Sequence, residues 1–273
     1  HPLLVNAPLV YDEPGRKALA SLYQTYIDIA SAAHKPFMMC TPTWRANHAR
    51  VVESGISSSI NVDAAHFLQG IRQSQSDGFH DIRIGGLIGC KNDCYLPEQA
   101  LSAEEAEVFH AWQLDQLKQG GVDFVIAETL PSVEEATGIA KAIESTGLPY
   151  FMSFVISRDG LVLDGTPLQA AIQTVDGHTV NKPLGYMVNC VYPSFLQAAH
   201  QPPSLFERLL GCLANASSLD HCDLDGSDEL KMESVAEWGD LMLQLNLEFG
   251  VKVLGGCCGT NEAHLSYLVD EAR

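Results

Sequence analysis

The chain has 273 residues, of which 46% are apolar and 18% are charged, a composition typical of folded globular proteins. Its 34 acidic residues outnumber its 16 lysines and arginines, so the formal net charge is −18. Because this charge repels polyanions, we expect neither nucleic acid nor an anionic membrane as a partner. No apolar run reaches the roughly 20 residues of a membrane-spanning helix, and the first residues resemble no export signal.

The chain contains many cysteines for a protein without a visible export signal. In a chain of this length, such cysteines are expected to be reduced thiols in the cytoplasm, and any cluster of them is a candidate metal or catalytic site. The eight are Cys40, Cys90, Cys94, Cys190, Cys212, Cys222, Cys257 and Cys258.

Seven short apolar runs predict β-strands. They are apolar throughout rather than alternating, which is typical of parallel strands covered on both faces. The runs span residues 36–41, 82–88, 123–128, 149–155, 184–190, 209–215 and 251–256.

Helical patterns lie between these runs. Residues 19–30 repeat apolar side chains at helical spacing before the first run. Three further helix starts are predicted from capping signals: Ser102 with Glu105, Ser132 with Glu135, and Thr166 with Pro167.

Strand and helix units recurring every 30 to 40 residues or so indicate repeated βαβ units around a parallel sheet. A (β/α)8 TIM barrel in a single domain, residues 1–273, is the expected fold, because about 250 residues is its usual size. A doubly wound open sheet is the alternative. One strand is missing from the count, and residues 1–15 have a loop-like sequence, so the first strand of the barrel is expected to be missing or atypical.

The last strand leads into residues 255–260, which read GGCCGT. Adjacent side chains of an extended strand point to opposite faces, so two neighbouring cysteines reach one ion only if the backbone leaves strand geometry. Glycine permits such backbone angles. We therefore expect Cys257 and Cys258 to point to the same place, followed by Thr260 as the cap of a helix that begins near Asn261.

A third sulfur is supplied by Cys190, which ends the run at 184–190. Strand ends of a parallel barrel gather on one face, so Cys190 is expected to meet Cys257 and Cys258 there. Three thiolates with an open fourth position are typical of catalytic zinc. The alternative is that the adjacent pair are small buried residues in a tight turn.

With Asn189 and Cys190 upstream, the GGCCGT segment resembles the zinc site of the homocysteine S-methyltransferase family. Shorter matches stand at other strand ends, at 41–44 (TPTW), 128–129 (ET), 153–154 (SF) and 164–167 (DGTP). The resemblance implies a (β/α)8 barrel and a zinc-dependent enzyme. It also implies that a methyl group moves from a sulfonium or quaternary ammonium donor to the thiol of homocysteine or a similar thiol, with both substrates small molecules.

The resemblance also suggests residues that contact the substrates. It implies that Glu128 holds the ammonium group of the acceptor, although an interaction with a helix dipole or a salt bridge at the rim is the alternative. Asn189 is a candidate for binding the substrate or orienting a metal ligand, and the alternative is that it only satisfies loop backbone. Trp44 is a candidate for stacking on a cationic donor, or else a core residue. Three hydroxyl groups are candidates for binding a substrate carboxylate or the backbone: Thr41, Thr43 and Ser153.

The remaining candidates have simpler interpretations. Cys90 and Cys94 form a C-x3-C pair near the same rim, for which a second metal or a redox role is a minor alternative to packing. The other cysteines and the isolated histidines are expected to be packing or solvated residues: Cys40, Cys212, Cys222, His264 and residues 221–223 (HCD).

Two departures from the family's pattern affect the predicted substrates. The family's first strand carries an aspartate- and glycine-rich segment that this chain lacks, and residues 214–221 (ANASSLDH) replace a different segment found in many relatives. Two other functions stay open. One is a homocysteine-binding module that accepts methyl groups from a corrinoid partner, which would have to bring its own corrinoid. The other is a non-catalytic metal-binding barrel.

Overall fold

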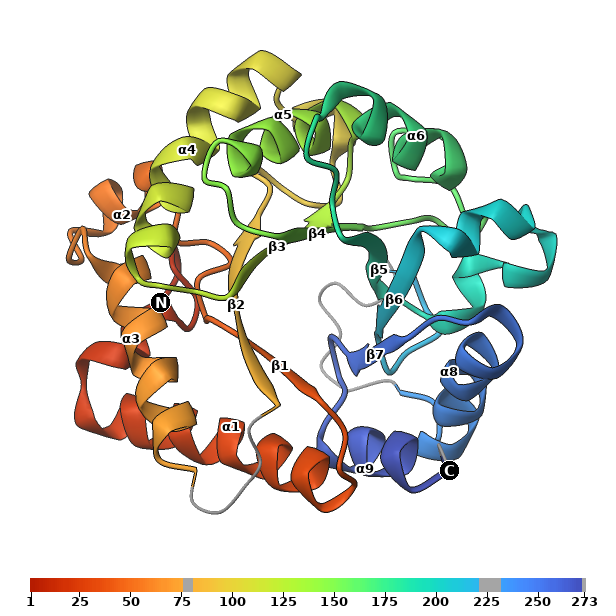
Figure 1. Ribbon diagram of the computed structural model, residues 1–273, viewed down its shortest axis with the longest axis horizontal. Helices are drawn as coiled ribbons and strands as arrows, with labels where there is room; N and C mark the ends of the chain where they lie inside the picture. The colour runs from red at the N-terminus through yellow and green to blue at the C-terminus, as the bar shows by residue number, and fades with distance from the viewer. Residues whose placement is uncertain (76–80, 221–231, 272–273) are drawn as a thin grey trace.

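The computed structural model describes residues 1–75, 81–220 and 232–271. Seven parallel strands follow one another in sequence order around one sheet, and each coincides with a predicted apolar run (Figure 1). They are β1 (Phe37–Cys40), β2 (Ile82–Gly89), β3 (Phe124–Leu130), β4 (Tyr150–Phe154), β5 (Gly185–Val191), β6 (Leu209–Ala214) and β7 (Val253–Gly256).

Helices surround the outside of this sheet (Figure 1). The α-helices are α1 (Glu13–Ala32), α2 (His48–Ser54), α3 (Ile60–Gln73), α4 (Ala103–Gln119), α5 (Val133–Glu144), α6 (Leu168–His178), α8 (Val235–Phe249) and α9 (Glu262–Glu271). Short 3-10 helices are η1 (Ala7–Tyr11), η2 (Pro97–Gln99), η3 (Pro193–Leu196), η4 (Ala198–His200) and η5 (Pro203–Glu207).

The inner face of the sheet is packed with its own side chains. Phe124, Ile126 and Met187 form a buried cluster that also contacts side chains from β1, β2, β4 and β7. The rings of Phe124 and Phe151 meet edge to face, with centroids 5.7 Å apart. Strands from opposite sides of the sheet can share such a cluster only if the sheet curls around it, so the fold is of the TIM-barrel type and not the open doubly wound alternative.

The barrel lacks one strand in the part of the chain that is described. Before β1, residues 1–36 contain turns, η1 and α1 but no strand. Strand pairing runs from β1 to β7 and does not close between these two, whereas α1 and α9 contact each other on the outside. Leu4 is fully buried, in a small cluster with Ala7 and Ile60.

Three of the predicted helix starts differ in detail from the structure. Ser102 and Glu105 form the expected capping box. Ser132 also caps its helix, but it accepts its hydrogen bond from the backbone N–H of Glu134, so the predicted box with Glu135 is wrong. The reason is that the Glu135 carboxylate is fully buried and binds other groups.

The start of α6 was also predicted wrongly in detail. Pro167 itself occupies the N-cap position, and no side chain caps the helix. At α9, the side chain of Asn261 accepts a hydrogen bond from the backbone N–H of Ala263. Thr260, the predicted cap, instead donates its hydroxyl to the carbonyl oxygen of Cys257 at 2.8 Å.

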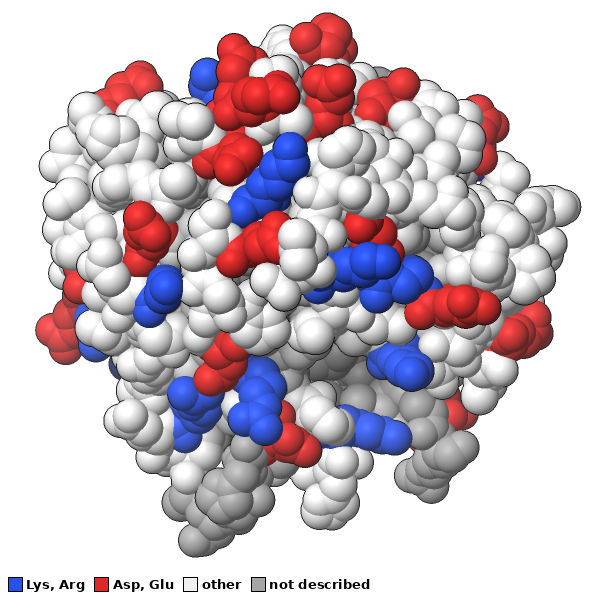
Figure 2. Space-filling model, turned by 45° about the horizontal axis from the view of Figure 1, so that its top comes forward, with Lys and Arg blue, Asp and Glu red and all other residues white. Residues whose placement is uncertain are grey.

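Among the described segments, no helix combines the length and apolar character required to cross a membrane. The face drawn in Figure 2 shows lysine and arginine side chains interspersed with acidic ones. This face therefore carries both signs of charge, although the formal net charge of the chain is −18.

Candidate metal centre and active site

Three cysteine sulfurs meet at the carboxyl end of the barrel. Cys190 is the last residue but one of β5, and Cys257 and Cys258 directly follow β7. The sulfur of Cys190 is 2.8 Å from that of Cys257 and 3.9 Å from that of Cys258. All three sulfurs lie within 4.8 Å of one another. The three sulfurs come together because β6 alone separates β5, which carries Cys190, from β7, which precedes Cys257 and Cys258.

The segment after β7 is held by the end of β6. The backbone N–H of Cys257 donates to the carbonyl of Ala214 at 2.8 Å, and the N–H of Ala216 donates to the carbonyl of Cys258 at 2.9 Å. The Asn215 side-chain oxygen accepts from the N–H of Cys258 at 3.2 Å. Asn215 was not predicted as a site residue. Its sequence signal was its place at the end of a predicted strand, at the same rim as Cys190.

Two glycines allow this tight segment. A Cβ added at Gly256 would lie 2.0 Å from the hydroxyl oxygen of Thr260, so a side chain cannot fit there. Gly259 has a φ of +81°, in the left-handed region that favours glycine. The expectation that glycine backbone angles let the chain leave strand geometry next to the cysteines is therefore met at Gly259, whereas Gly256 leaves room for the Thr260 side chain.

The three sulfurs can all ionise only if a positive charge lies between them. Hydrogen bonds from Cys190 and Cys257 lower the pKa of the Cys258 thiol to about 3. The hydrogen bond with Cys190 raises the pKa of Cys257 above its usual value. Without a cation, the protons of two thiols therefore stabilise one thiolate, and further ionisation would place like charges side by side.

The arrangement of these donors fits a thiolate-binding metal ion. A tetrahedral zinc site with Zn–S bonds of about 2.3 Å separates its sulfurs by about 3.8 Å. The distance of 3.9 Å between Cys190 and Cys258 matches this value, and the distance of 2.8 Å between Cys190 and Cys257 would have to widen by about 1 Å when the ion binds. No other His, Cys, Asp or Glu of the described residues joins the group. Three sulfur ligands would leave one position open for a substrate, as in catalytic zinc sites.

Asn189 precedes Cys190 and is fully buried. Its side-chain oxygen accepts hydrogen bonds from the backbone N–H of Thr129 at 2.8 Å and from the hydroxyl of Ser153 at 2.7 Å. Its amide nitrogen donates to the hydroxyl oxygen of Thr129 at 2.7 Å. Ser153, a predicted substrate residue, is itself fully buried, and its hydroxyl binds Asn189.

Glu128 lies near the end of β3 and keeps part of its surface exposed. Burial of its carboxyl group raises its pKa to about 7. None of the ion pairs among the described residues involves this carboxylate, so the alternative interpretation, a rim salt bridge, is not found in the part of the chain that is described. The negative charge of Glu128 contributes to the raised pKa of the Cys190 thiol, so the two groups are close enough to interact.

Thr41 and Thr43 are fully buried where β1 ends beside β2. Their hydroxyl oxygens are 2.7 Å apart. The Thr43 hydroxyl donates to the carbonyl of Leu87, and the Leu87 N–H donates to the Thr41 hydroxyl oxygen. These hydroxyls therefore continue the pairing of the two strands, and their contact with a substrate stays a prediction.

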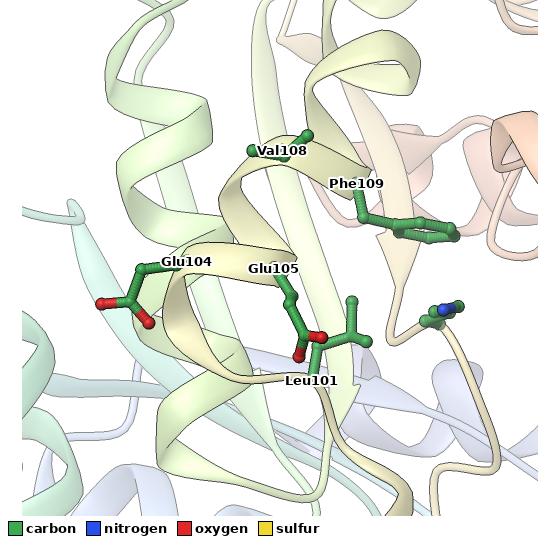
Figure 3. A pocket seen from close by; sticks show the side chains of 6 residues that line it. Leu101, Glu104, Glu105, Val108 and Phe109 are labelled. Carbon is green, nitrogen blue, oxygen red and sulfur yellow. The ribbon is translucent and has the colours of Figure 1, made fainter.

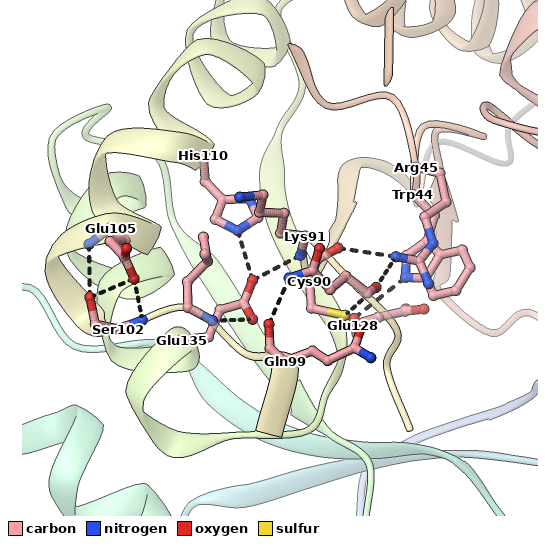
Figure 4. Close-up of polar contacts among 12 residues, drawn as sticks. Trp44, Arg45, Cys90, Lys91, Gln99, Ser102, Glu105, His110, Glu128 and Glu135 are labelled. Atoms are coloured by element: carbon pink, nitrogen blue, oxygen red, sulfur yellow. Dashed lines mark hydrogen bonds and ion pairs between the residues drawn. The ribbon is translucent and has the colours of Figure 1, made fainter. Parts of the chain in front are cut away.

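Trp44 is partly buried, and Figure 4 shows it beside Arg45 and Glu128. Its indole nitrogen is 3.5 Å from the backbone oxygen of Glu128. The guanidinium of Arg45 lies 4.0 Å from the centre of its ring, so this cation already stacks on the indole. Arg45 also donates to the carbonyls of Cys90 and Asn92, at 3.2 and 2.5 Å, and so holds the loop after β2.

The other cysteines show packing roles where they are described. Cys90, Cys94 and Cys212 are buried. Burial raises the pKa of Cys90 to about 12 and that of Cys94 to about 11. In the described ranges, neither belongs to a group of three metal-binding side chains. Cys40 packs against the barrel's inner cluster. Cys222 and its neighbours at 221 and 223 lie outside the described residues.

His264 is buried on α9 as a packing residue. Its Nδ1 lies 3.0 Å from the side-chain oxygen of Asn261, and its ring meets that of Trp238 edge to face. A separate shallow hollow of about 470 Å³, drawn in Figure 3, lies beside α4. Its lining contains none of the predicted site residues and consists of Lys91, Leu101, Glu104, Glu105, Val108 and Phe109.

The family described as homocysteine S-methyltransferase matches residues 2–272. A homocysteine S-methyltransferase of Escherichia coli (strain K12) is 26% identical over 178 residues, which are 64% of this chain and 56% of that protein. Homocysteine S-methyltransferase YbgG of Bacillus subtilis (strain 168) is 25% identical over 188 residues, 66% of this chain and 56% of that protein. The matches thus span little more than half the length of these relatives.

A solved structure has the same fold. The metallated form of the homocysteine methyltransferase MmuM from Escherichia coli superposes with a TM-score of 0.76 and 18% sequence identity, covering 97% of this chain and 87% of that one. At this identity the likeness concerns the fold. The match of the family to nearly the whole sequence establishes the relationship. The chain belongs to the homocysteine S-methyltransferase family.

Proposed function

We propose that this protein is a zinc-dependent methyltransferase. It moves a methyl group from a sulfonium or quaternary ammonium donor to the thiol of homocysteine or a similar small thiol. Cys190, Cys257 and Cys258 hold the metal. The observation that carries the proposal is the meeting of these three sulfurs within 4.8 Å at the barrel rim, with no fourth ligand among the described residues.

The chemistry needs a thiolate as nucleophile. A free thiol has a pKa near 8.5 and is mostly protonated at neutral pH. Zinc, when held by the three cysteines, would supply the positive charge that lowers the pKa of a coordinating thiol, so that the thiol releases its proton to solvent. The acceptor's sulfur then forms a bond to the methyl carbon, while the donor's C–S or C–N bond breaks. The electron pair of that bond stays with the donor, which leaves as a neutral thioether or amine.

The protein's other task is to hold the acceptor. Glu128 lies near Cys190, and none of the ion pairs among the described residues involves its carboxylate. Burial raises the energy of the charged carboxylate, and the positive ammonium group of an amino-acid thiol would lower that energy again. A substrate with an ammonium group and a thiol fits the pairing of Glu128 with the cysteine site. Trp44 lies near Glu128, and because Arg45 stacks on one face of its ring, a cationic donor would have to use the other face.

The experiment is a methyl-transfer assay of the zinc-loaded protein with homocysteine and, in turn, S-methylmethionine, S-adenosylmethionine and betaine. We expect methionine to form with one of these donors and not in a matched C257S variant. Activity with methylcobalamin alone would instead favour the module that serves a corrinoid partner. Zinc binding without turnover of any thiol would favour a non-catalytic barrel and overturn the proposal.

Two further parts of the proposal concern the whole chain. We propose that residues 1–273 form a single domain, in support of which strands and helices alternate around one sheet. We also propose that the protein works in the cytoplasm, where thiols stay reduced. In support of this, the seven cysteines among the described residues are all free.

A further inference from the structure

One buried side chain connects three neighbouring strand ends at the site. The Asn189 amide belongs to β5, its oxygen accepts from Thr129 on β3 and from Ser153 on β4, and its nitrogen donates back to Thr129. The amide thus makes three hydrogen bonds without any contact with solvent. Three of the four hydrogen-bonding positions of the amide are used in this way, and a buried group held by three bonds fixes the geometry of the elements that it joins.

The backbone on both sides of this amide is strained. Thr129 has a φ of +61° and Cys190 a φ of +53°, values that residues other than glycine rarely adopt. A β-branched threonine is an outlier there, and such a conformation persists only where surrounding contacts impose it. Two of the three bonds of Asn189 go to Thr129, and Cys190 is its direct neighbour in the chain.

Both strained residues interrupt the strand register. The pairing of β3 with β4 shifts between Ala127 and Leu130, and that of β5 with β6 shifts between Asn189 and Val191. A bulge of this kind re-aims the side chains beside it. The two side chains affected are Glu128, immediately before Thr129, and Cys190 itself. These are the proposed acceptor contact and a proposed metal ligand.

We propose that Asn189 is a positioning residue that sets the spacing between the Cys190 sulfur and the Glu128 carboxylate, and thereby selects the length of the thiol substrate. The inference rests on the proposed function and deepens it. The distance between thiol and ammonium group differs by one methylene between homocysteine and cysteine. If the Cys190 sulfur and the Glu128 carboxylate are held at a fixed distance, the site favours a thiol substrate of one length. If that distance can vary, the site loses this preference.

The test uses Asn189→Ala, Asn189→Asp and a matched control, Asn61→Ala. Asn61 is also fully buried and bonds through both ends of its amide, to Ala46 and Gln113, but it lies on α3. The first readout is the zinc dissociation constant from competition with a chelator, which does not depend on activity. We expect N189A to weaken zinc about 10- to 100-fold, the usual effect of removing a residue that orients a ligand.

The second readout is the ratio of kcat/KM for homocysteine to that for cysteine. We expect this ratio to fall in N189A, to recover in part in N189D, which keeps both accepted hydrogen bonds, and to stay unchanged in N61A. Should N189A fail to fold, Ser153→Ala removes one of the three bonds and is expected to shift both readouts in the same direction by less.

Unchanged zinc affinity together with an unchanged substrate ratio in N189A, or in S153A where N189A fails to fold, would overturn the inference while leaving the methyltransferase intact. Equal losses of zinc affinity in N189A and N61A would also overturn it, because a general loss of stability would then explain both. If the wild type methylates no thiol, the proposed function fails, and the zinc measurement still decides whether Asn189 positions Cys190.

Discussion

The sulfur of Cys190 lies 2.8 Å from that of Cys257, although 67 positions separate the two residues in sequence. We expect about one zinc ion per chain in the wild type and little in C257S, because a serine hydroxyl is a poor substitute for a thiolate ligand. Metal content after dialysis measures this. Cys212→Ala is the control, since Cys212 is buried in β6 outside the cluster. Equal zinc in C257S and the wild type would contradict the ligand assignment.

The raised pKa of Glu128 predicts a pH-dependent affinity for the acceptor. As the pH falls below about 7, the carboxyl group takes up a proton and loses its attraction for an ammonium group, so KM for the acceptor should rise. In E128Q we expect KM to be about 30-fold higher, equivalent to about 2 kcal/mol for a buried charge pair, and to lack this pH-dependent limb. A KM that depends on pH identically in both proteins would show that Glu128 does not bind the acceptor.

The same shift predicts how stability changes with pH. The ordinary pKa of 4.5 is raised to about 7 in the folded protein, so the folded state holds a proton that the unfolded chain has already released. The wild type should therefore lose stability relative to E128Q as the pH rises from 4.5 to about 7. Urea unfolding of both proteins at several pH values measures the difference, and parallel curves would refute the shift.

The strands and the cysteine site were predictable because their signals are local. Apolar runs identify buried parallel strands, and the parallel order brings strand ends to one rim, which is how Cys190 and Cys257 could be paired from the sequence. The strained backbone of Thr129 and Cys190 was not predictable, because nothing in their own residue types favours a positive φ. It depends on contacts with Asn189 that form only in the folded barrel.

Glu135 shows how a local signal can mislead. Its spacing from Ser132 is that of a capping box, but its carboxylate is buried between the loop after β2 and α4. It accepts from the backbone N–H groups of Lys91 and Leu101, partners more than thirty residues away in the sequence. A local sequence pattern cannot show that distant N–H groups compete for the Glu135 carboxylate, so its buried hydrogen bonds appear only in the structure.

The Glu135 contacts predict a large loss of stability on substitution. The carboxylate binds two backbone N–H groups and lies 3.2 Å from the Nε2 of His110, and both side chains are fully buried (Figure 4). Glu135→Leu leaves these partners without an acceptor, so we expect a loss of about 3 to 5 kcal/mol in the free energy of unfolding. The control is Glu134→Gln, an exposed neighbour on the same helix. Matching urea midpoints for the two variants would show that the buried contacts contribute little.

The close approach of Trp44 to β2 predicts that a side chain at Gly89 lowers stability, in contrast to a glycine that has free space around it. A Cβ at Gly89 would lie 2.3 Å from the indole nitrogen of Trp44, and the stacked Arg45 restricts how far the ring can move. We therefore expect Gly89→Ala to cost about 1 to 3 kcal/mol, as overpacking does, and to shift tryptophan fluorescence.

Gly177 on α6 is the matched case, because a Cβ there would meet no atom within 4 Å. Alanine favours a helix over glycine by about 0.5 to 1 kcal/mol, so Gly177→Ala should raise stability by an amount of that order. Thermal unfolding and fluorescence of both variants measure the contrast. If G89A were as stable as the wild type with unchanged fluorescence, the indole would have to lie elsewhere, and Trp44 would no longer stand beside Glu128 as a surface for the donor.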